Sequence, residues 1–373
     1  MSARLLAAGA LILLLAACAS VQPLQSSADT AKIDGDEKRV WAEAREADAV
    51  IRNSDQIYPD AAATRYLQGV MDRLYPEFRG SITVHILKAP SLNAFALPNG
   101  SVYFHLGLLA RLDNEAQLAT VLGHEAAHFV HKHGYQEREH LKSMSAFAAV
   151  VPGIGDLIGS SSVYGYSRDL EREADELGFQ RLVKAGYDPR EAPKTFEILA
   201  ADVKSEEIDE PYFFSTHPRL IERVETMQTL AAARPKGGRV GRPEFLAVTG
   251  RLRIAALESD LSMNHYKSVL LVLGDKNRVK EYPPEAQFYL GEAYRLRGDK
   301  GDETLMEKSY LAAVGRAPRF APAQRALGVY YMKKKDYRHA EQYLAAYLRL
   351  APNAPDSGYV RQYYNDMRKG SGK

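Results

Sequence analysis

The chain has 373 residues, of which 46% are hydrophobic and 26% are charged, and its formal net charge is +2. That composition predicts a folded globular protein of about two domains. The nearly balanced charge, without a basic patch interleaved with aromatic residues, argues against nucleic-acid binding. Because Cys18 is the only cysteine, a disulfide within the chain is excluded.

Residues 1–17 predict a signal peptide, because a short start with one arginine precedes an apolar run that is too short to span a bilayer as a helix. The run ends in Leu15-Ala16-Ala17-Cys18, which resembles a bacterial lipoprotein box and implies cleavage before Cys18 and lipidation of its sulfur. An ordinary signal peptide with an incidental cysteine is the alternative. Because Ala19 rather than an aspartate follows, we expect a lipoprotein anchored to the outer membrane on the periplasmic side. Residues 18–36 would then form a lipidated, flexible tether.

Helical periodicity in two pieces covers residues 37–75 and predicts scaffold helices. Residues 82–87 alternate and are rich in β-branched side chains, which predicts a strand. A Pro-Asn-Gly turn then separates residues 93–97 from residues 101–105, so a small sheet precedes the next helix. Either of these last two segments is a candidate edge strand that holds an extended peptide by backbone pairing. An ordinary hairpin is the alternative.

The next predicted helix begins after Asn114, a good N-cap residue, and carries His124-Glu125-x-x-His128. Residues four apart lie on one helix face, so His124 and His128 are spaced to bind one metal ion. Glu125 lies beside that face and can act as a base on a metal-bound water. A core helix with two satisfied histidines is the alternative. Gly134 is expected to end the helix.

Two histidines leave a catalytic zinc site incomplete, because such sites use three protein ligands and a water. A second predicted helix, from Ser167 to Gly186, supplies acidic candidates. Glu171, Asp175 and Gly178 share one face of this helix. The glutamate can ligate zinc, the aspartate can hold a ligand histidine by its other ring nitrogen, and the glycine allows close helix packing. A solvated acidic helix is the alternative.

His124-Glu125-x-x-His128 followed by Glu171-x-x-x-Asp175 resembles the HtpX and CAAX-prenyl-protease family of zinc metallopeptidases. The resemblance spans residues 40–232 and implies that the zinc ligands are the two histidines and Glu171, not Glu173. Three shorter fragments fit the same family in the same order: Asn93–Gly100, Gly107–Leu109 and Thr216–Pro218.

Residues 144–165 are apolar but broken by proline and glycine, which fits either a mobile loop over the cleft or a buried hairpin. His131, His133 and His140 follow the first motif, and we expect each at the surface.

His217 precedes Pro218, which suits the first turn of a helix, so His217 is placed at or near an N-cap. The positive helix end favours a neutral imidazole there. Three roles stay open: a fourth zinc ligand that keeps the enzyme latent, a group that stabilises the oxyanion, and a plain helix cap. Arg223 is expected to face the same site and is the second candidate for oxyanion stabilisation.

Residues 234–243, rich in Gly, Arg and Pro, predict a linker. Beyond it, Leu290-Gly291-x-x-Tyr294 recurs as Leu327-Gly328-x-x-Tyr331, and other residues repeat at a spacing of 34. This pattern resembles the tetratricopeptide repeat (TPR), and residues 245–273 look like a third, degenerate pair of helices. Such arrays present a concave surface for protein partners, and a purely structural role is the alternative.

The predicted fold is therefore mainly α with a small β-sheet. A zincin-type metalloprotease domain covers residues 37–233, and an α-helical TPR solenoid covers residues 244–373. We expect a zinc endopeptidase with one Zn²⁺ per chain and Glu125 as its general base. The resemblance to periplasmic members of the family implies protein or peptide substrates, quality control of outer-membrane proteins and the β-barrel assembly machinery as a partner. A chaperone or scaffold with a latent or structural zinc site is the alternative.

Overall fold

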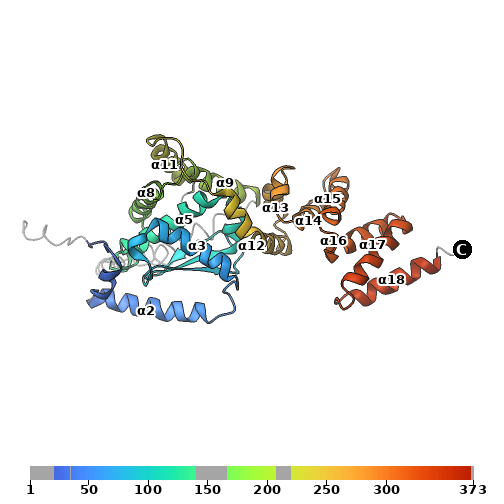
Figure 1. The fold of residues 1–373 in the computed structure, drawn as a ribbon, viewed down its shortest axis with the longest axis horizontal. Coiled ribbons are helices and arrows are strands. Elements are labelled where there is room, and N and C mark those ends of the chain that lie inside the picture. Colours follow the sequence, from blue (N-terminus) through green and yellow to red (C-terminus); the bar gives the residue numbers. More distant parts are fainter. Residues whose placement is uncertain (1–20, 34, 140–165, 207–219, 371–373) are drawn as a thin grey trace, which may run out of the picture.

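The computed structural model describes residues 21–33, 35–139, 166–206 and 220–370. It is mainly helical with one three-stranded sheet, which confirms the predicted fold class. The sheet and the helices around it form one end of the molecule, and the C-terminal helices form the other (Figure 1). Among the described helices, none combines the length and hydropathy that crossing a bilayer requires. The predicted signal peptide with Cys18, the 144–165 segment, His140 and His217 lie outside the described residues.

The helices follow the chain in two groups. The first group surrounds the sheet and consists of α2 (Gly35–Arg52), α3 (Ala61–Leu74), α4 (Leu106–Arg111), α5 (Glu115–Val130), α8 (Arg168–Lys184), α9 (Glu191–Glu206) and α11 (Leu220–Ala232). The second group consists of α12 (Arg242–Ser262), α13 (Tyr266–Leu273), α14 (Ala286–Arg297), α15 (Asp302–Arg316), α16 (Ala321–Lys333), α17 (Tyr337–Leu350) and α18 (Ser357–Gly370). Short 3-10 helices occupy Ser27–Ala31, Pro76–Phe78 and Arg278–Glu281.

The sheet consists of β1 (Thr83–Leu87), β2 (Ala94–Ala96) and β3 (Ser101–His105) in the order β1-β3-β2. β1 runs parallel to β3, and β2 runs antiparallel to it. The strand predicted at residues 82–87 is confirmed to within one residue. The prediction of an edge strand at residues 101–105 is wrong, because β3 is the central strand and all its residues are buried. Of the two candidates, only β2 lies at an edge.

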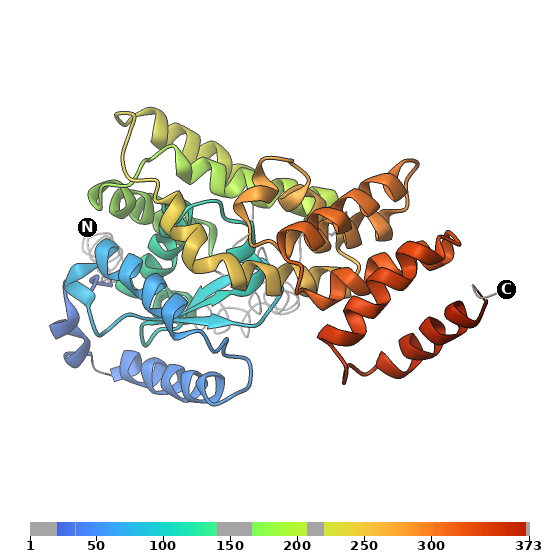
Figure 2. The same ribbon diagram turned by 45° about the vertical axis from the view of Figure 1, so that its right-hand side comes forward.

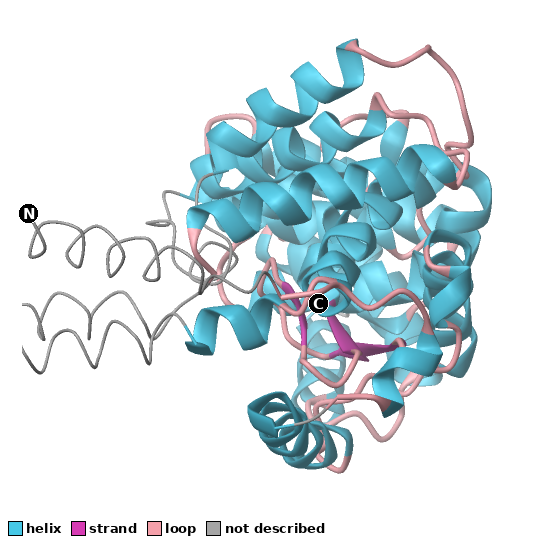
Figure 3. Ribbon diagram, turned by 90° about the vertical axis from the view of Figure 1, so that its left-hand side faces the viewer, coloured by secondary structure: helices cyan, strands magenta, loops and turns pink. Residues whose placement is uncertain are grey.

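The sheet lies between α2 on one face and α3 with α5 on the other (Figures 2 and 3). On the first face, Tyr103 of β3 donates its hydroxyl hydrogen to the Asp48 carboxylate of α2 at 2.7 Å. Its neighbours Val102 and Phe104 point to the opposite face and join the main hydrophobic core. The alternation along β3 thus buries both faces of the strand and fixes its register.

α5 is the central helix of the first group, and every one of its residues is buried. It begins as predicted, because the Asn114 side chain is the N-cap and accepts a hydrogen bond from the Gln117 backbone N–H at 3.0 Å. Its end differs from the prediction. The chain turns at Lys132, which has a left-handed φ of +58°, and continues as a helix from residue 133 to 139. Gly134 therefore lies inside the next helical segment and does not end α5.

The segment predicted as a linker, residues 234–243, packs against the first group of helices. The Arg239 guanidinium pairs with the buried Glu115 carboxylate at 2.7 Å, and the Arg239 backbone is hydrogen-bonded to Gly186 and Asp188. α12 continues this packing, since it contributes Phe245 and other residues to the core that contains α3 and α5. The two groups of helices are therefore joined through a shared core at α12.

The repeated Leu-Gly-x-x-Tyr fragments have the same packing role in both copies. Gly291 of α14 faces Tyr310 of α15, and a Cβ on this glycine would lie 2.5 Å from the tyrosine ring. Gly328 of α16 faces Leu344 of α17, and a Cβ there would lie 2.4 Å from the leucine side chain. In each repeat, the glycine lets consecutive helices approach closely, which explains the recurrence of the fragment in the helical solenoid.

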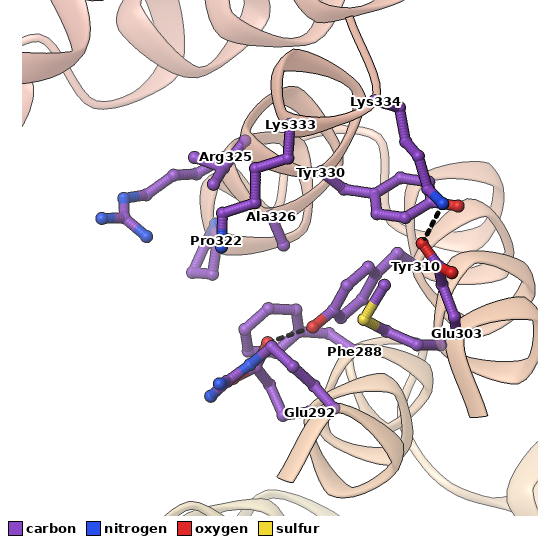
Figure 4. A pocket seen from close by; sticks show the side chains of 13 residues that line it. Phe288, Glu292, Glu303, Tyr310, Pro322, Arg325, Ala326, Tyr330, Lys333 and Lys334 are labelled. Atoms are coloured by element: carbon purple, nitrogen blue, oxygen red, sulfur yellow. Dashed lines mark hydrogen bonds and ion pairs between the residues drawn. The ribbon is translucent and has the colours of Figure 1, made fainter. Parts of the chain in front are cut away.

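A pocket with a volume of about 640 Å³ lies between α14, α15 and α16 (Figure 4). Phe288, Met306 and Tyr310 give it an apolar floor. The cations and acids at its rim are largely paired with one another, as Lys334 is with Glu303. Lys333 is exposed and has no ion-pair partner among the described residues. The pocket therefore combines an apolar floor with one available positive charge.

Candidate metal centre

Three side chains from two helices converge inside the first group: His124 and His128 of α5, and Glu171 of α8. The Nε2 atoms of the two histidines are 3.1 Å apart. One oxygen of the Glu171 carboxylate lies 3.5 Å from Nε2 of His124, and the other lies 3.3 Å from Nε2 of His128. All three side chains are buried. The structure thus brings together the three residues that were predicted as ligands.

The separations fit a single zinc ion. With zinc bonds of about 2.1 Å to nitrogen and oxygen, tetrahedral ligand atoms lie roughly 3.4 Å apart. The two nitrogens are 3.1 Å apart, and the Glu171 carboxylate approaches them with a different oxygen each, at 3.5 and 3.3 Å, which is close to that value. Two imidazoles and one carboxylate are also a ligand set that catalytic zinc uses when it keeps a position for water.

Two glycines allow α5 and α8 to approach where they cross. A Cβ on Gly178 would lie 2.7 Å from the His124 backbone nitrogen, and a Cβ on Gly123 would lie 3.0 Å from the Gly178 carbonyl oxygen. The predicted close packing at Gly178 is confirmed. Because the contact involves the backbone of His124 itself, it helps to set the distance between this ligand and Glu171.

Asp175 contacts the side of His124 that faces away from the ligand group. Its Oδ1 lies 2.9 Å from Nδ1 of His124, as predicted, so that nitrogen carries the ring hydrogen and Nε2 is left to bind a metal. Arg223 of α11 donates to the same carboxylate at 2.6 and 3.1 Å. Burial by itself raises the pKa of Asp175. The charge of Arg223 and the hydrogen bond from His124 outweigh that effect and hold the pKa below its usual range.

The structure places Arg223 beside Asp175 and His124, and its predicted role in stabilising the oxyanion stays a prediction. Its guanidinium lies 3.0 Å from Nδ1 of His124, on the opposite side of the ring from Nε2. It also packs over the Phe196 ring, 4.3 Å from the centroid. These contacts place Arg223 on the Nδ1 side of His124, where it holds the Asp175 carboxylate.

His128 has a second support that sequence reasoning missed. Its Nδ1 lies 2.9 Å from Nδ1 of His133. The prediction of a surface position for His133 is wrong, because its ring is fully buried, whereas His131 is partly buried. Burial, together with the neighbouring imidazoles of His131 and His124, lowers the pKa of His133 to about 3, so its ring is neutral and can accept the hydrogen of His128. No helical spacing signals this contact, because it depends on the left-handed turn at Lys132.

Tyr166 covers another side of His128, and it was also missed by the sequence reasoning. The two rings are stacked with centroids 3.9 Å apart at an angle of 13°. Burial raises the pKa of Tyr166, and the nearby carboxylates of Glu125 and Glu171 raise it further, so the phenol keeps its hydrogen. Glu125, the predicted base, is fully buried beside His124 on α5.

Comparison with known proteins finds a family match over part of the chain. Residues 61–231 match the model of peptidase family M48. The chain is 30% identical over 202 residues to the mitochondrial metalloendopeptidase OMA1 of Arabidopsis thaliana, covering 50% of this chain and 38% of the relative. It is 25% identical over 240 residues to a putative beta-barrel assembly-enhancing protease of Vibrio cholerae, covering 58% of this chain and 49% of the relative. It is 26% identical over 189 residues to the beta-barrel assembly-enhancing protease of Escherichia coli, covering 45% of this chain and 39% of the relative.

The chain spans less than half the length of these relatives. The family match runs from α3 to α11, so it contains all the residues that converge on His124, His128 and Glu171. The resemblance expected from the sequence is thereby confirmed for residues 61–231. Residues 61–231 therefore form a domain that matches peptidase family M48.

Proposed function

We propose that this chain is a zinc-dependent endopeptidase. The observation that supports this most directly is the spacing of His124, His128 and Glu171, with 3.1 to 3.5 Å between ligand atoms, inside an M48 domain. Structural zinc sites use four protein ligands, whereas three side chains form this group among the described residues. A site with three ligands leaves a position for the water that hydrolysis requires.

The roles of the surrounding residues follow from their positions. Zinc would supply an activated water and polarise the peptide carbonyl. Glu125 accepts a proton from the attacking water and returns it to the leaving amine. Asp175 and His133 hold the two histidines with Nε2 directed toward the ligand group.

We also propose that substrates bind as an extended strand along β2. Backbone groups of Asn93 and Leu97 pair with β3, so the backbone of the partly exposed Ala96 points to the opposite edge of the strand. Ala96 lines a small hollow together with His128, which places this edge next to the ligand group. Backbone pairing does not depend on side chains, so it suits a protease that acts on unfolded segments of many sequences.

The wider role is proposed from the relatives. Two of them are named as beta-barrel assembly-enhancing proteases. We therefore propose that this chain degrades misassembled outer-membrane proteins in the periplasm, with a lipid on Cys18 as its anchor. The solenoid would work as a TPR domain, in which the apolar floor and Lys333 of the pocket bind a hydrophobic segment that carries an acidic residue (Figure 4). Unfolded substrate is the proposed occupant of this pocket.

The variant Glu125→Gln tests the proposed function. It should keep one zinc ion and lose cleavage of unfolded casein by about 100-fold or more, because the base is removed while the ligands remain. Glu176→Gln, on the exposed face of α8, is the matched control and should keep both zinc and activity. If the zinc-loaded native protein cleaves neither casein nor short peptides, the endopeptidase proposal is refuted in favour of a chaperone or scaffold with a structural zinc ion.

A further inference from the structure

A second group of candidate ligands lies at the turn that follows α5. It consists of His131 in that turn, His133 at the start of the next helical segment and Glu173 of α8, whose ligand atoms all lie within 4.8 Å of one another. Nδ1 of His131 is 3.3 Å from one oxygen of Glu173, and Nε2 of His133 is 3.6 Å from the other. Both distances are close to the roughly 3.4 Å that separates the ligands of one tetrahedral ion.

His133 provides an independent indication of a ligand at this place. Its ring is fully buried, and its Nε2 has no hydrogen-bond partner among the described residues. Buried polar atoms are normally hydrogen-bonded, so an unpartnered nitrogen that faces a carboxylate 3.6 Å away needs an explanation. An ion bound between Nε2 of His133 and Glu173 would satisfy both groups.

The ligand set indicates the class of ion. Two imidazoles and one carboxylate favour a divalent transition metal over Mg²⁺ or Ca²⁺, which prefer oxygen ligands. The side chain of Glu173 is 46% exposed and that of His131 is 19% exposed, so water can complete the coordination and the ion can exchange with solvent. We propose that His131, His133 and Glu173 form a second, weaker site for an ion such as Zn²⁺, and that its occupation weakens metal binding at the first group.

The two sites are connected by one hydrogen bond. Nδ1 of His128 and Nδ1 of His133 are 2.9 Å apart, which accommodates one hydrogen between them. When His128 binds a metal through Nε2, its hydrogen is on Nδ1 and His133 accepts it, so His133 carries its own hydrogen on Nε2. When a metal ion occupies Nε2 of His133 instead, the ring hydrogen of His133 is on its Nδ1. There it faces the Nδ1–H of His128. Two donors that face each other repel, so each metal ion lowers the affinity for the other.

The number of zinc ions bound per chain tests whether the second site exists. The expected effect of that site on catalysis rests on the proposed endopeptidase function. Metal-free full-length protein is titrated with Zn²⁺ in equilibrium dialysis. The native chain should bind two equivalents, the second at least 10-fold more weakly than the first. Glu173→Gln should bind one equivalent with high affinity. Glu176→Gln, an exposed acid on the same helix, should bind two and controls for the loss of a surface charge.

Peptidase activity gives the second readout. Zn²⁺ in excess of one equivalent should inhibit the native chain and Glu176→Gln, while Glu173→Gln should keep its activity. One equivalent in the native chain, or two in Glu173→Gln, overturns the second site. Two equivalents without inhibition overturn the coupling. If no variant cleaves a peptide at any zinc concentration, the proposed function fails, but the number of bound ions still decides whether the second site exists.

Discussion

Replacing Gly178 by alanine should weaken zinc binding without changing a single ligand. A Cβ at this position would lie 2.7 Å from the His124 nitrogen, 2.8 Å from the Gly123 carbonyl carbon and 3.0 Å from the His124 Cα. All three are backbone atoms of α5, so no side-chain rotation relieves the contact. α8 therefore has to move away from α5, and Glu171 moves with it.

The structure gives the size of this movement. An ordinary contact begins at 3.4 Å, so the closest pair has to separate by about 0.7 Å. Overpacking of this kind costs about 1–3 kcal/mol of folding free energy. For a domain of about 200 residues, this lowers the melting temperature by roughly 2–12 °C. Metal sites tolerate about 0.2 Å in ligand distance, so we expect zinc affinity to fall about 10- to 100-fold, as it does when outer-shell support is lost.

Competition with a chelator measures the zinc affinity, and thermal unfolding of the metal-free protein measures the stability. Gly69→Ala is the matched control, because no atom lies within 4 Å of the Cβ it would add to α3. That variant should bind zinc normally and be more stable by about 0.5–1 kcal/mol, because alanine favours the helix. The reasoning is refuted if Gly178→Ala binds zinc as tightly as Gly69→Ala and unfolds at the same temperature.

Three further variants test individual parts of the proposal. Glu171→Gln should lower zinc content at one equivalent of added metal, whereas Glu176→Gln should not; equal zinc content in both would remove Glu171 from the ligand set. Ala96→Pro should raise KM for peptides roughly 2- to 10-fold at unchanged zinc content, because it removes one backbone donor from the edge of β2; an unchanged KM would exclude β2 as the strand that binds substrate. Lys333→Glu should slow cleavage of casein but not of a short peptide, with Lys308→Glu, an exposed residue of α15 outside the pocket, as control. Equal rates for casein in both lysine variants would argue against the pocket as a binding site.

The helices that carry the ligands follow from local sequence signals. Asn114 caps α5 by a side-chain hydrogen bond, and residues four apart on that helix face one point. The same spacing argument separates Glu171, which reaches the ligand group, from Glu173, which faces away from it. Periodicity predicts such features because they depend only on the geometry of a single helix.

Two of the features that were missed depend on contacts between distant parts of the chain, and a third depends on an unusual backbone turn. The central position of β3 arises because β1 pairs with it in parallel, which no hairpin signal reveals. The predicted linker is held because Arg239 reaches Glu115, which is 124 residues away in the sequence. His133 is buried because the chain turns at Lys132, a residue type that rarely adopts a left-handed conformation. For β3 and Arg239 the deciding partner is far away in the sequence, and for His133 the turn at Lys132 interrupts the helical periodicity on which the prediction relies.

The role of Arg223 can be settled by comparing two single variants with the double variant. Asp175→Asn keeps the shape of the side chain but leaves the buried guanidinium without its carboxylate, which should cost about 3–5 kcal/mol. Arg223→Met removes the buried guanidinium charge. In this background, Asp175→Asn should lower the free energy of unfolding by much less than it does in the native chain. Residues in one such network show a coupling of roughly 0.5–3 kcal/mol.

If Arg223 positions Asp175, both single variants should lower zinc affinity, and their effects on stability should fall short of additivity in the double variant. The contacts favour this outcome, because Arg223 donates twice to Asp175 and lies on the Nδ1 side of His124. If Arg223 instead stabilised the oxyanion, Arg223→Met would lower kcat while zinc affinity stayed unchanged, and its effect on stability would add to that of Asp175→Asn. Zinc affinity and kcat measured on the same three variants therefore distinguish a positioning residue from a catalytic one.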